Sequence, residues 1–449
     1  MRSGLTWQAL RKHRWGFVGP FATQCLAAAV ITAMVTTAVS MSAAVLTPDE
    51  RRILDESDMA DAAAAFLGSS IYLSILMVGV TMVAAIARQA RDIALLRAVG
   101  ATPGRIRRSV ARQAALVAAP AAALGFGLGL GLGRVWLSLL VIHDVLPAAI
   151  HFRPVLWALP MVIGIEVVTS VVGALVAAIR PSRVRPATAL AETATRQTAG
   201  GAVRAVLGVV LLVGGVVLSA LLSRVDAEQA DAGGLFVILG MCVGVGMLGP
   251  VLLGVAARLA WPLLRLAGDT GVLARDAMVA RSRALSTALI PLVLAGSFAA
   301  VKVGAYATAE HVTGVRPPAA DMWLEYSGTA IFVAFAVIGA VNTLLTVSVG
   351  RERELALMRL AGATRARVLA VWACEAGLVL GTVLVLAAGV ALATLVPMTR
   401  TAFGAWPYIG PAQVALGVLG GAAVVAAGTM VPAAVLTRRP PIESVRVQM

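Results

Sequence analysis

The sequence predicts an all-α polytopic membrane protein, and three observations lead to this fold class. Hydrophobic residues make up 59% of the 449 residues, charged residues only 13%, and the mean hydropathy is +0.90. Soluble domains carry about 45–50% apolar and about 25% charged residues. Uncharged runs such as 17–46 and 205–223 approach or exceed the ~20 residues that cross ~30 Å of hydrocarbon as a helix. This composition argues against a water-soluble enzyme and excludes a disordered chain.

Hydrophobic runs bounded by charges or prolines predict about ten transmembrane helices. They lie at about 17–46, 67–88, 112–141, 154–179, 205–223, 234–257, 285–307, 327–350, 368–397 and 411–436. The loops alternate in charge, with acidic residues at 49–61, 224–231 and 310–325 and arginines at 88–112 and 180–204. The positive-inside rule then places the basic loops and both termini in the cytoplasm, as an even number of spans requires. We therefore expect a multi-pass protein of the plasma membrane.

The remaining composition points away from several other classes. A net charge of +15 would suggest a nucleic-acid partner in a soluble chain, but here the arginines of the cytoplasmic loops account for it. Cys25, Cys242 and Cys374 lie in apolar runs and predict neither a disulfide framework nor a metal site. The four histidines are dispersed, with no catalytic or metal-ligating spacing. We expect no nucleic acid, no metal and no catalytic residue.

An internal repeat divides the chain. The segment RDIALLRAVGAT at 91–102 recurs as RELALMRLAGAT at 353–364, and both contain the skeleton LxRxxGAT. Each copy follows one long apolar run and precedes two more. Two copies of one membrane unit form a pseudo-dimer, as in many transporters. The predicted domains are a four-span unit with an N-terminal amphipathic helix at 1–192, a linker with two spans at 193–268, and a second four-span unit at 269–449.

Each copy of the repeat predicts a helix, a tight turn and a second helix. Gly100 and Gly362 suit the left-handed position that follows a helix C-terminus. Thr102 and Thr364 suit the N-cap of the next helix, with Pro103 at the first helical position in the first copy. We call these two segments, 97–105 and 359–367, the elbows.

Arginines follow the glycine turn in both elbows. In the first copy they recur at helical spacing and form one basic face. The residues are Arg105, Arg108 and Arg112, and in the second copy Arg365 and Arg367. A helical elbow at the cytoplasmic surface could dock a soluble partner, or it could be a plain hairpin whose arginines contact anionic lipid headgroups. Two copies of one skeleton favour docking, because topology alone does not require such detail.

The second copy carries a specific motif. GAVNTLL at 339–345 runs into RERELALMRLAGAT at 351–364, and this resembles the signature of FtsX-like (MacB-type) ABC transporter permeases. The first copy matches the core of the motif, so the resemblance spans both four-span units. It implies that the elbows are coupling helices, each docking into a nucleotide-binding subunit. The ten-span layout is similar to the BceB type, in which one permease chain works with two ATPase subunits.

The resemblance implies a set of ATPase-docking residues and has one clear departure. The residues are Arg97, Gly100, Ala101, Thr102 and Arg105 in the first elbow, and Arg359, Gly362, Ala363, Thr364 and Arg367 in the second. MacB-type and BceB-type relatives carry a large extracellular domain after the first span of a unit. Here the corresponding loops are only about 47–66 and 309–327, which leaves a cavity in the membrane as the expected substrate contact.

ATP chemistry is not expected in this chain. A Walker A loop needs a lysine after its glycines, and the two lysines, Lys12 and Lys302, have no such context. The glycine-rich run at 124–133 lies inside a span, where Gly125, Gly129 and Gly133 form a small-residue face for helix packing. The chain is therefore predicted to have no cofactor of its own and not to be an enzyme, with ATP and magnesium bound by the partner ATPase.

Three ionisable residues inside predicted spans are functional candidates, because burying a charge in the membrane is costly. Glu166 lies mid-span with Thr169 and Ser170 in reach of a local hydrogen bond, and either a structural role or a substrate contact fits it. Lys302 could snorkel to the outer surface. Glu375 could pair with a nearby arginine, and its counterpart in the first copy is Gln113.

The leading functional hypothesis is the permease subunit of an ATP-driven transporter. It would export an amphipathic substrate such as a lipid, a hydrophobic peptide or an antibiotic-like compound, with outward direction implied by the family resemblance. The alternative is a non-transporting FtsX-like protein that relays ATPase motion to an external partner. An ion-coupled secondary carrier is a third hypothesis, and it predicts more buried acids and no doubled elbow.

Overall fold

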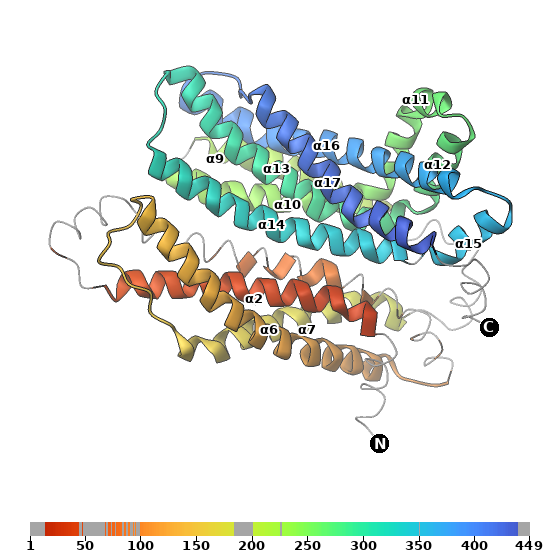
Figure 1. Ribbon diagram of the computed structural model, residues 1–449, viewed down its shortest axis with the longest axis horizontal. Coiled ribbons are helices and arrows are strands. Elements are labelled where there is room, and N and C mark those ends of the chain that lie inside the picture. The colour runs from red at the N-terminus through yellow and green to blue at the C-terminus, as the bar shows by residue number, and fades with distance from the viewer. Residues whose placement is uncertain are drawn as a thin grey trace. The chain divides into compact units, whose positions relative to one another are not determined.

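The computed structural model describes residues 14–44, 47, a broken series between 68 and 95, and residues 99–183, 201–224, 227–349 and 351–438. Its ordered elements are helical, with no strand among the described residues (Figure 1). The first elements are α2 (Arg14–Ser42), α6 (Pro103–Ile142), the 3₁₀ turn η1 (Leu156–Ala158), α7 (Leu159–Arg183), α9 (Gly201–Leu222), α10 (Ala227–Leu259) and α11 (Trp261–Leu266). They are followed by α12 (Asp269–Ala280), α13 (Ser282–Thr313), α14 (Ala319–Val349), α15 (Glu352–Leu360), α16 (Arg365–Phe403) and α17 (Pro411–Leu436).

Among the described residues, 9 segments are long and apolar enough to cross a membrane. They match every predicted span except 67–88, which the structure describes only as a broken series of helical residues between 68 and 86. The prediction of an all-α polytopic membrane protein is confirmed. The predicted amphipathic helix near the N-terminus and the loop at 48–66 lie outside the described residues.

Two helices run further than the sequence indicates. The elbow helix and the span expected at 112–141 form one helix, α6, of 40 residues, and α16 is similarly long at 39 residues. At 1.5 Å per residue each is roughly 60 Å long, about twice the hydrocarbon thickness. The loop expected at 309–327 shrinks to 314–318, because α13 and α14 both continue toward it.

The chain divides by its contacts into two compact units. Unit 1 comprises 1–197 and 317–335, and unit 2 comprises 198–316 and 336–449. This grouping is spatial, so the three predicted sequence domains remain a prediction. Each unit is described separately below.

In unit 1, α2 packs against α6 and α7 (Figure 1). Helices α2 and α6 approach closely because glycines line the contact. A Cβ built at Gly129 would lie 2.6 Å from the Ala29 carbonyl oxygen, and one at Gly125 or Gly133 would also overlap α2. The predicted small-residue face is confirmed. The intervening Gly127 and Gly131 face open space.

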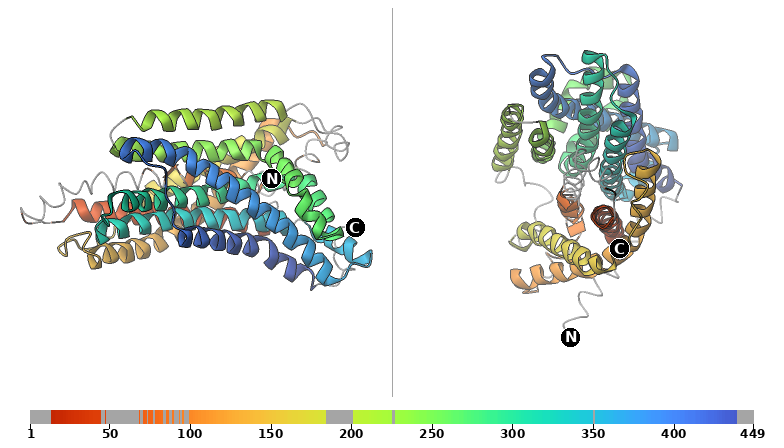
Figure 2. Two further views of the ribbon diagram at one scale, coloured as in Figure 1. Left: turned by 90° about the horizontal axis from the view of Figure 1, so that it is seen from above. Right: turned by 90° about the vertical axis from the view of Figure 1, so that its left-hand side faces the viewer.

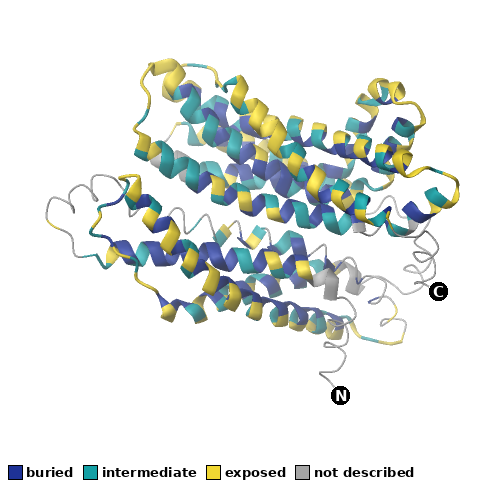
Figure 3. Cartoon of the chain, viewed as in Figure 1, coloured by how far each residue is buried: buried dark blue, intermediate teal, exposed yellow. Residues whose placement is uncertain are grey.

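In unit 2, α10 packs against α9 and α13, and α16 packs against α13 and α17. Figure 2 shows α9 running alongside α10. Helices α9 and α17 are the least buried of these spans, since only 17% and 11% of their most apolar stretches are buried. They expose apolar side chains such as Val213 and Leu419. The exposed stretches of α17 are visible in Figure 3. Apolar side chains exposed over a whole spanning helix fit contact with lipid tails.

Replacing Gly129 by alanine is expected to destabilise the chain by about 1–3 kcal/mol, because the added methyl group overlaps the backbone of α2. Gly131→Ala is the matched control, since the same change one glycine further along meets open space and improves helix propensity. Thermal unfolding of the two purified variants checks the difference. Equal melting temperatures would contradict the close packing of α2 and α6.

Candidate functional site

The second elbow is a tight reversal between α15 and α16. The N–H of Gly362 donates to the Arg359 carbonyl at 3.1 Å, and the N–H of Ala363 donates to the Met358 carbonyl at 3.0 Å. These two bonds form a Schellman motif, which requires a left-handed residue after the helix C-cap. Gly362 supplies it with a φ of +90°. Glycine is needed here because a Cβ would be strained in this conformation.

The next helix begins immediately after that turn. The Thr364 hydroxyl accepts a hydrogen bond from the N–H of Arg367 at 3.3 Å, which confirms the predicted N-cap of α16. Ala363 packs against a buried cluster that includes Leu355 of α15 and Trp372 of α16. A small apolar residue therefore fits between the turn and the core, and α15 folds back on the start of α16.

The first elbow has the same backbone geometry. Gly100 has a φ of +94°, and Thr102 is the N-cap of α6 in extended conformation with Pro103 at the first turn. The Thr102 side chain makes no capping bond, while its carbonyl accepts from the N–H of Arg105 at 3.1 Å. Ala101 packs against the neighbouring core cluster, as Ala363 does in unit 2. Arg97 lies outside the described residues.

The arginines of the two elbows are used differently. Those that follow the first elbow are exposed along one face of α6, as predicted: Arg105, Arg108 and Arg112. In unit 2, Arg359 donates to the Thr437 carbonyl at the end of α17 at 3.0 Å, and Arg367 pairs with Asp269 of α12 at 2.8 Å. Arg359 thus satisfies a carbonyl that a helix C-terminus leaves without an internal partner.

An ion cluster with two buried and two partly exposed members lies at the base of the second elbow, and only Glu375 of it was predicted. Glu375 Oε2 lies 2.8 Å from Arg351 Nη1, and Glu375 Oε1 lies 3.6 Å from Arg281 Nη1. Glu354 of α15 pairs with Arg281 and lies 3.5 Å from Arg351 Nε. The cluster joins the α12–α13 corner, the α14–α15 corner, α15 and α16. It balances two positive against two negative charges.

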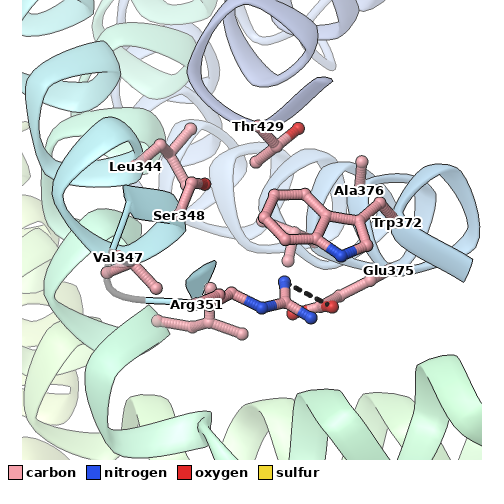
Figure 4. A pocket seen from close by; sticks show the side chains of 10 residues that line it. Leu344, Val347, Ser348, Arg351, Trp372, Glu375, Ala376 and Thr429 are labelled. Carbon is pink, nitrogen blue, oxygen red and sulfur yellow. Dashed lines mark ion pairs between the residues drawn. The ribbon is translucent and has the colours of Figure 1, made fainter. Parts of the chain in front are cut away.

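The Arg351 side chain contacts Trp372 as well as Glu375. Its guanidinium lies 4.0 Å from the centre of the Trp372 ring, a cation–π distance, and its Nη1 faces Glu375 (Figure 4). The side chains of Arg351 and Glu375 are 7% and 6% exposed. These groups line a small cavity together with Ser348 and Thr429. The spacing of three residues could have suggested the Arg351–Glu354 pair. Arg281 is distant in sequence from its partners, so no local spacing could have predicted its pairing.

Burial lowers the pKa of Arg351 to about 10, and the adjacent Glu375 carboxylate opposes this shift. Burial also lowers the pKa of Arg281, again against the attraction of Glu375. Charged guanidinium groups lose hydration when buried, and a nearby carboxylate restores part of that loss. Arg351 therefore remains charged at neutral pH, and the cluster is ionic.

The other two intramembrane candidates lie elsewhere. Glu166 is 1% exposed in α7, and neither of its carboxylate oxygens has a hydrogen-bond partner. The local bond expected from Thr169 or Ser170 is therefore not formed, and the Ser170 hydroxyl accepts a hydrogen bond from the Gln24 amide of α2. Lys302 is half-buried in α13. No group of three or more potential metal ligands occurs in the part of the chain that the structure describes.

The comparison with protein families identifies the chain. The model of the FtsX-like permease C-terminal family matches residues 64–185 and 326–441, which together are more than half of the sequence. The chain belongs to the FtsX-like permease family. Each matched segment contains one elbow, and the two matches begin at the same spacing as the two copies of the repeat. A comparison with curated proteins found no match.

Membership of the FtsX-like permease family decides the class of function. The family consists of membrane transport components and not of catalytic enzymes, and its members generally work with ABC ATPase partners. The protein is therefore a multi-pass membrane protein with an ABC-type permease role. The linking helices α9 and α10 and the short helix α12 lie outside both matched segments.

Removing Glu375 alone is expected to destabilise the FtsX-like permease strongly. Glu375→Gln leaves Arg351 and Arg281 to share Glu354 alone, and the one positive charge in excess at this site is expected to cost about 3–5 kcal/mol. Asp269→Asn is the control, because it breaks an exposed pair worth about 0–1 kcal/mol. Thermal unfolding in detergent measures both. A melting temperature for Glu375→Gln equal to that of the control would contradict a buried ionic cluster.

Replacing Glu166 is expected to stabilise the protein, in contrast to replacing Glu375. Glu166→Gln removes an unpartnered carboxyl group and is expected to raise stability by about 1–3 kcal/mol, since an amide is less costly to bury than a carboxylate. Glu310→Gln makes the same chemical change at an exposed position and is expected to have no effect. If the Glu166 variant unfolds at a lower temperature in the same assay, its carboxylate has a stabilising partner.

Proposed function

We propose that the chain is the permease subunit of an ATP-driven ABC transporter that exports an amphipathic substrate, and that two separate ATPase subunits dock at its elbows. The observation that supports this best is the shared geometry of the elbows. Both have a left-handed glycine followed by an N-cap threonine, and both lead directly into a long spanning helix. A docked subunit that moves an elbow would therefore move α6 or α16 as well.

The proposed docking residues are those expected from the sequence. They are Arg97, Gly100, Ala101, Thr102 and Arg105 in the first elbow, and Arg359, Gly362, Ala363, Thr364 and Arg367 in the second. Gly100, Thr102, Gly362 and Thr364 are exposed, which fits contact with a soluble subunit. ATP and magnesium would be bound in the ATPase, one copy at each elbow. Both elbows and both termini would face the cytoplasm.

The proposed substrate is a lipid, a hydrophobic peptide or an antibiotic-like compound. The connections 314–318 and 404–410, at the ends of α13 and α16 remote from the elbow, are short. They offer little surface for an external partner, which favours transport through the membrane over relay to an outer protein. Glu166 remains a candidate substrate contact, because its carboxylate is not used by the protein's own hydrogen bonds.

Gly100→Arg combined with Gly362→Arg is expected to release the ATPase. A bulky side chain at φ of +94° and +90° distorts both elbows and projects from the docking surface. The measurement is purification of the tagged full-length chain from its own host in mild detergent, followed by intact-mass analysis. We expect two copies of a Walker-motif protein with the wild type and none with the double variant.

Gly404→Arg is the matched control for that experiment. Gly404 has a φ of +66° at the far end of α16, so the substitution imposes similar backbone strain away from the elbows. It is expected to keep both ATPase copies. A wild-type chain that purifies alone, with unchanged function in the double glycine variant, would refute docking and favour an ion-coupled carrier. A bound ATPase without ATP-dependent movement of any amphipathic compound would favour the relay of motion to an external partner.

A further inference from the structure

The two elbows have the same backbone but different residues at their base. In unit 2 the base holds Arg351, at the corner before α15, and Glu375, in the third turn of α16. The repeat places Gln89 and Gln113 at these positions in unit 1, at the same distances from the elbow glycine. Both glutamines are buried, at 6% and 5% exposure. A charged pair in one unit thus corresponds to two neutral amides in the other.

The correspondence is structural as well as sequential. The N–H of Gln89 donates to the carbonyl three residues before it at 2.9 Å, and its carbonyl accepts from the N–H of Ile93 at 2.9 Å. Arg351 makes the same two bonds, at 3.2 Å with Ser348 and at 3.1 Å with Leu355. Ile93 and Leu355 are both buried. The two base positions therefore have matching backbone geometry and differ in side-chain chemistry.

That difference changes how firmly each elbow is held. In a buried site the attraction between opposite charges is much stronger than the interaction of two amide dipoles. In unit 2 this attraction is reinforced by Trp372, which stacks on Arg351, and by Arg281, which brings the α12–α13 corner to the same carboxylate. In unit 1 the position of Trp372 is taken by Val110, which has no ring for a cation to contact.

We propose that Arg351 and Glu375 are positioning residues that stiffen the second elbow, whereas the neutral Gln89 and Gln113 leave the first elbow more compliant. The two elbows then differ in stiffness, and we call them unequal joints in this sense. If they are the ATPase docking sites, as proposed above, motion of one ATPase passes to α16 through a rigid contact and motion of the other passes to α6 through a softer one. Only this last step rests on the proposed function.

Hydrogen exchange of the purified full-length chain tests the unequal joints. The matched probes are the amides of Ile93 and Leu355, which form the first helical bond after each base residue. In the wild type, protection at Leu355 is expected to exceed that at Ile93 by about tenfold or more, since local opening reports local stability. Equal protection at the two amides would overturn the proposal, even if no variant folds.

A double variant then assigns the difference to the ion pair. Arg351→Gln with Glu375→Gln installs the residues of the first unit, and exchanging both charges for neutral groups avoids a lone buried charge. Protection at Leu355 is expected to fall about tenfold, which corresponds to ~1.4 kcal/mol, with Ile93 unchanged. Asp269→Asn, which breaks the exposed pair with Arg367, is expected to leave both amides unchanged. Unaltered protection at Leu355 in the double variant would overturn the proposal.

A second readout separates this inference from the proposed function. When the ATPase is bound, the double variant is expected to keep both ATPase copies but to lose most of the substrate stimulation of ATP hydrolysis, because the rigid contact is gone. Full stimulation in the double variant would overturn the role of the pair in coupling. A wild-type chain without a bound ATPase would contradict the proposed function, while the exchange at Ile93 and Leu355 would still decide whether the joints are unequal.

Discussion

A hydrocarbon layer offers no water to backbone N–H and C=O groups, so a spanning segment must satisfy these groups itself as a helix. The 9 apolar helices among the described residues meet this constraint. The same constraint decides where the chain can turn and where it can carry charge, because both require partners that hydrocarbon does not provide. The elbows lie at helix ends, where the left-handed Gly100 and Gly362 complete the turns.

The length of α6 and α16 follows from this arrangement and bears on function. Each begins at an elbow threonine and continues as one helix through its apolar stretch. An FtsX-like permease built in this way has no flexible segment between the elbow and the spanning helix. The residues that follow each elbow threonine and the apolar stretch are therefore parts of one continuous helix, while the two elbows differ in the residues at their base.

Glu375 and Glu166 show how the surroundings of one residue type determine its role. Glu375 lies among two arginines and a tryptophan and balances their charge. Glu166 is as deeply buried but has no hydrogen-bond partner. Their spacing along the chain gives no indication of this difference. The partners of Glu375 come from helix corners that are distant in sequence, and the hydroxyl next to Glu166 is occupied by Gln24 from another helix.

The sequence by itself determined the helical membrane class, nine of the spans, the repeated elbow and the glycine face of α6, because hydropathy, glycine spacing and cap residues act locally. It also contained the substitution of Gln113 for Glu375 between the two copies. Only the tertiary structure decided that Arg351 and Arg281 converge on Glu375. It also decided that Arg359 and Arg367 bind other helices, and that the Glu166 carboxylate has no hydrogen-bond partner. Such contacts depend on which helices pack together, and that packing is a property of the whole fold rather than of any segment.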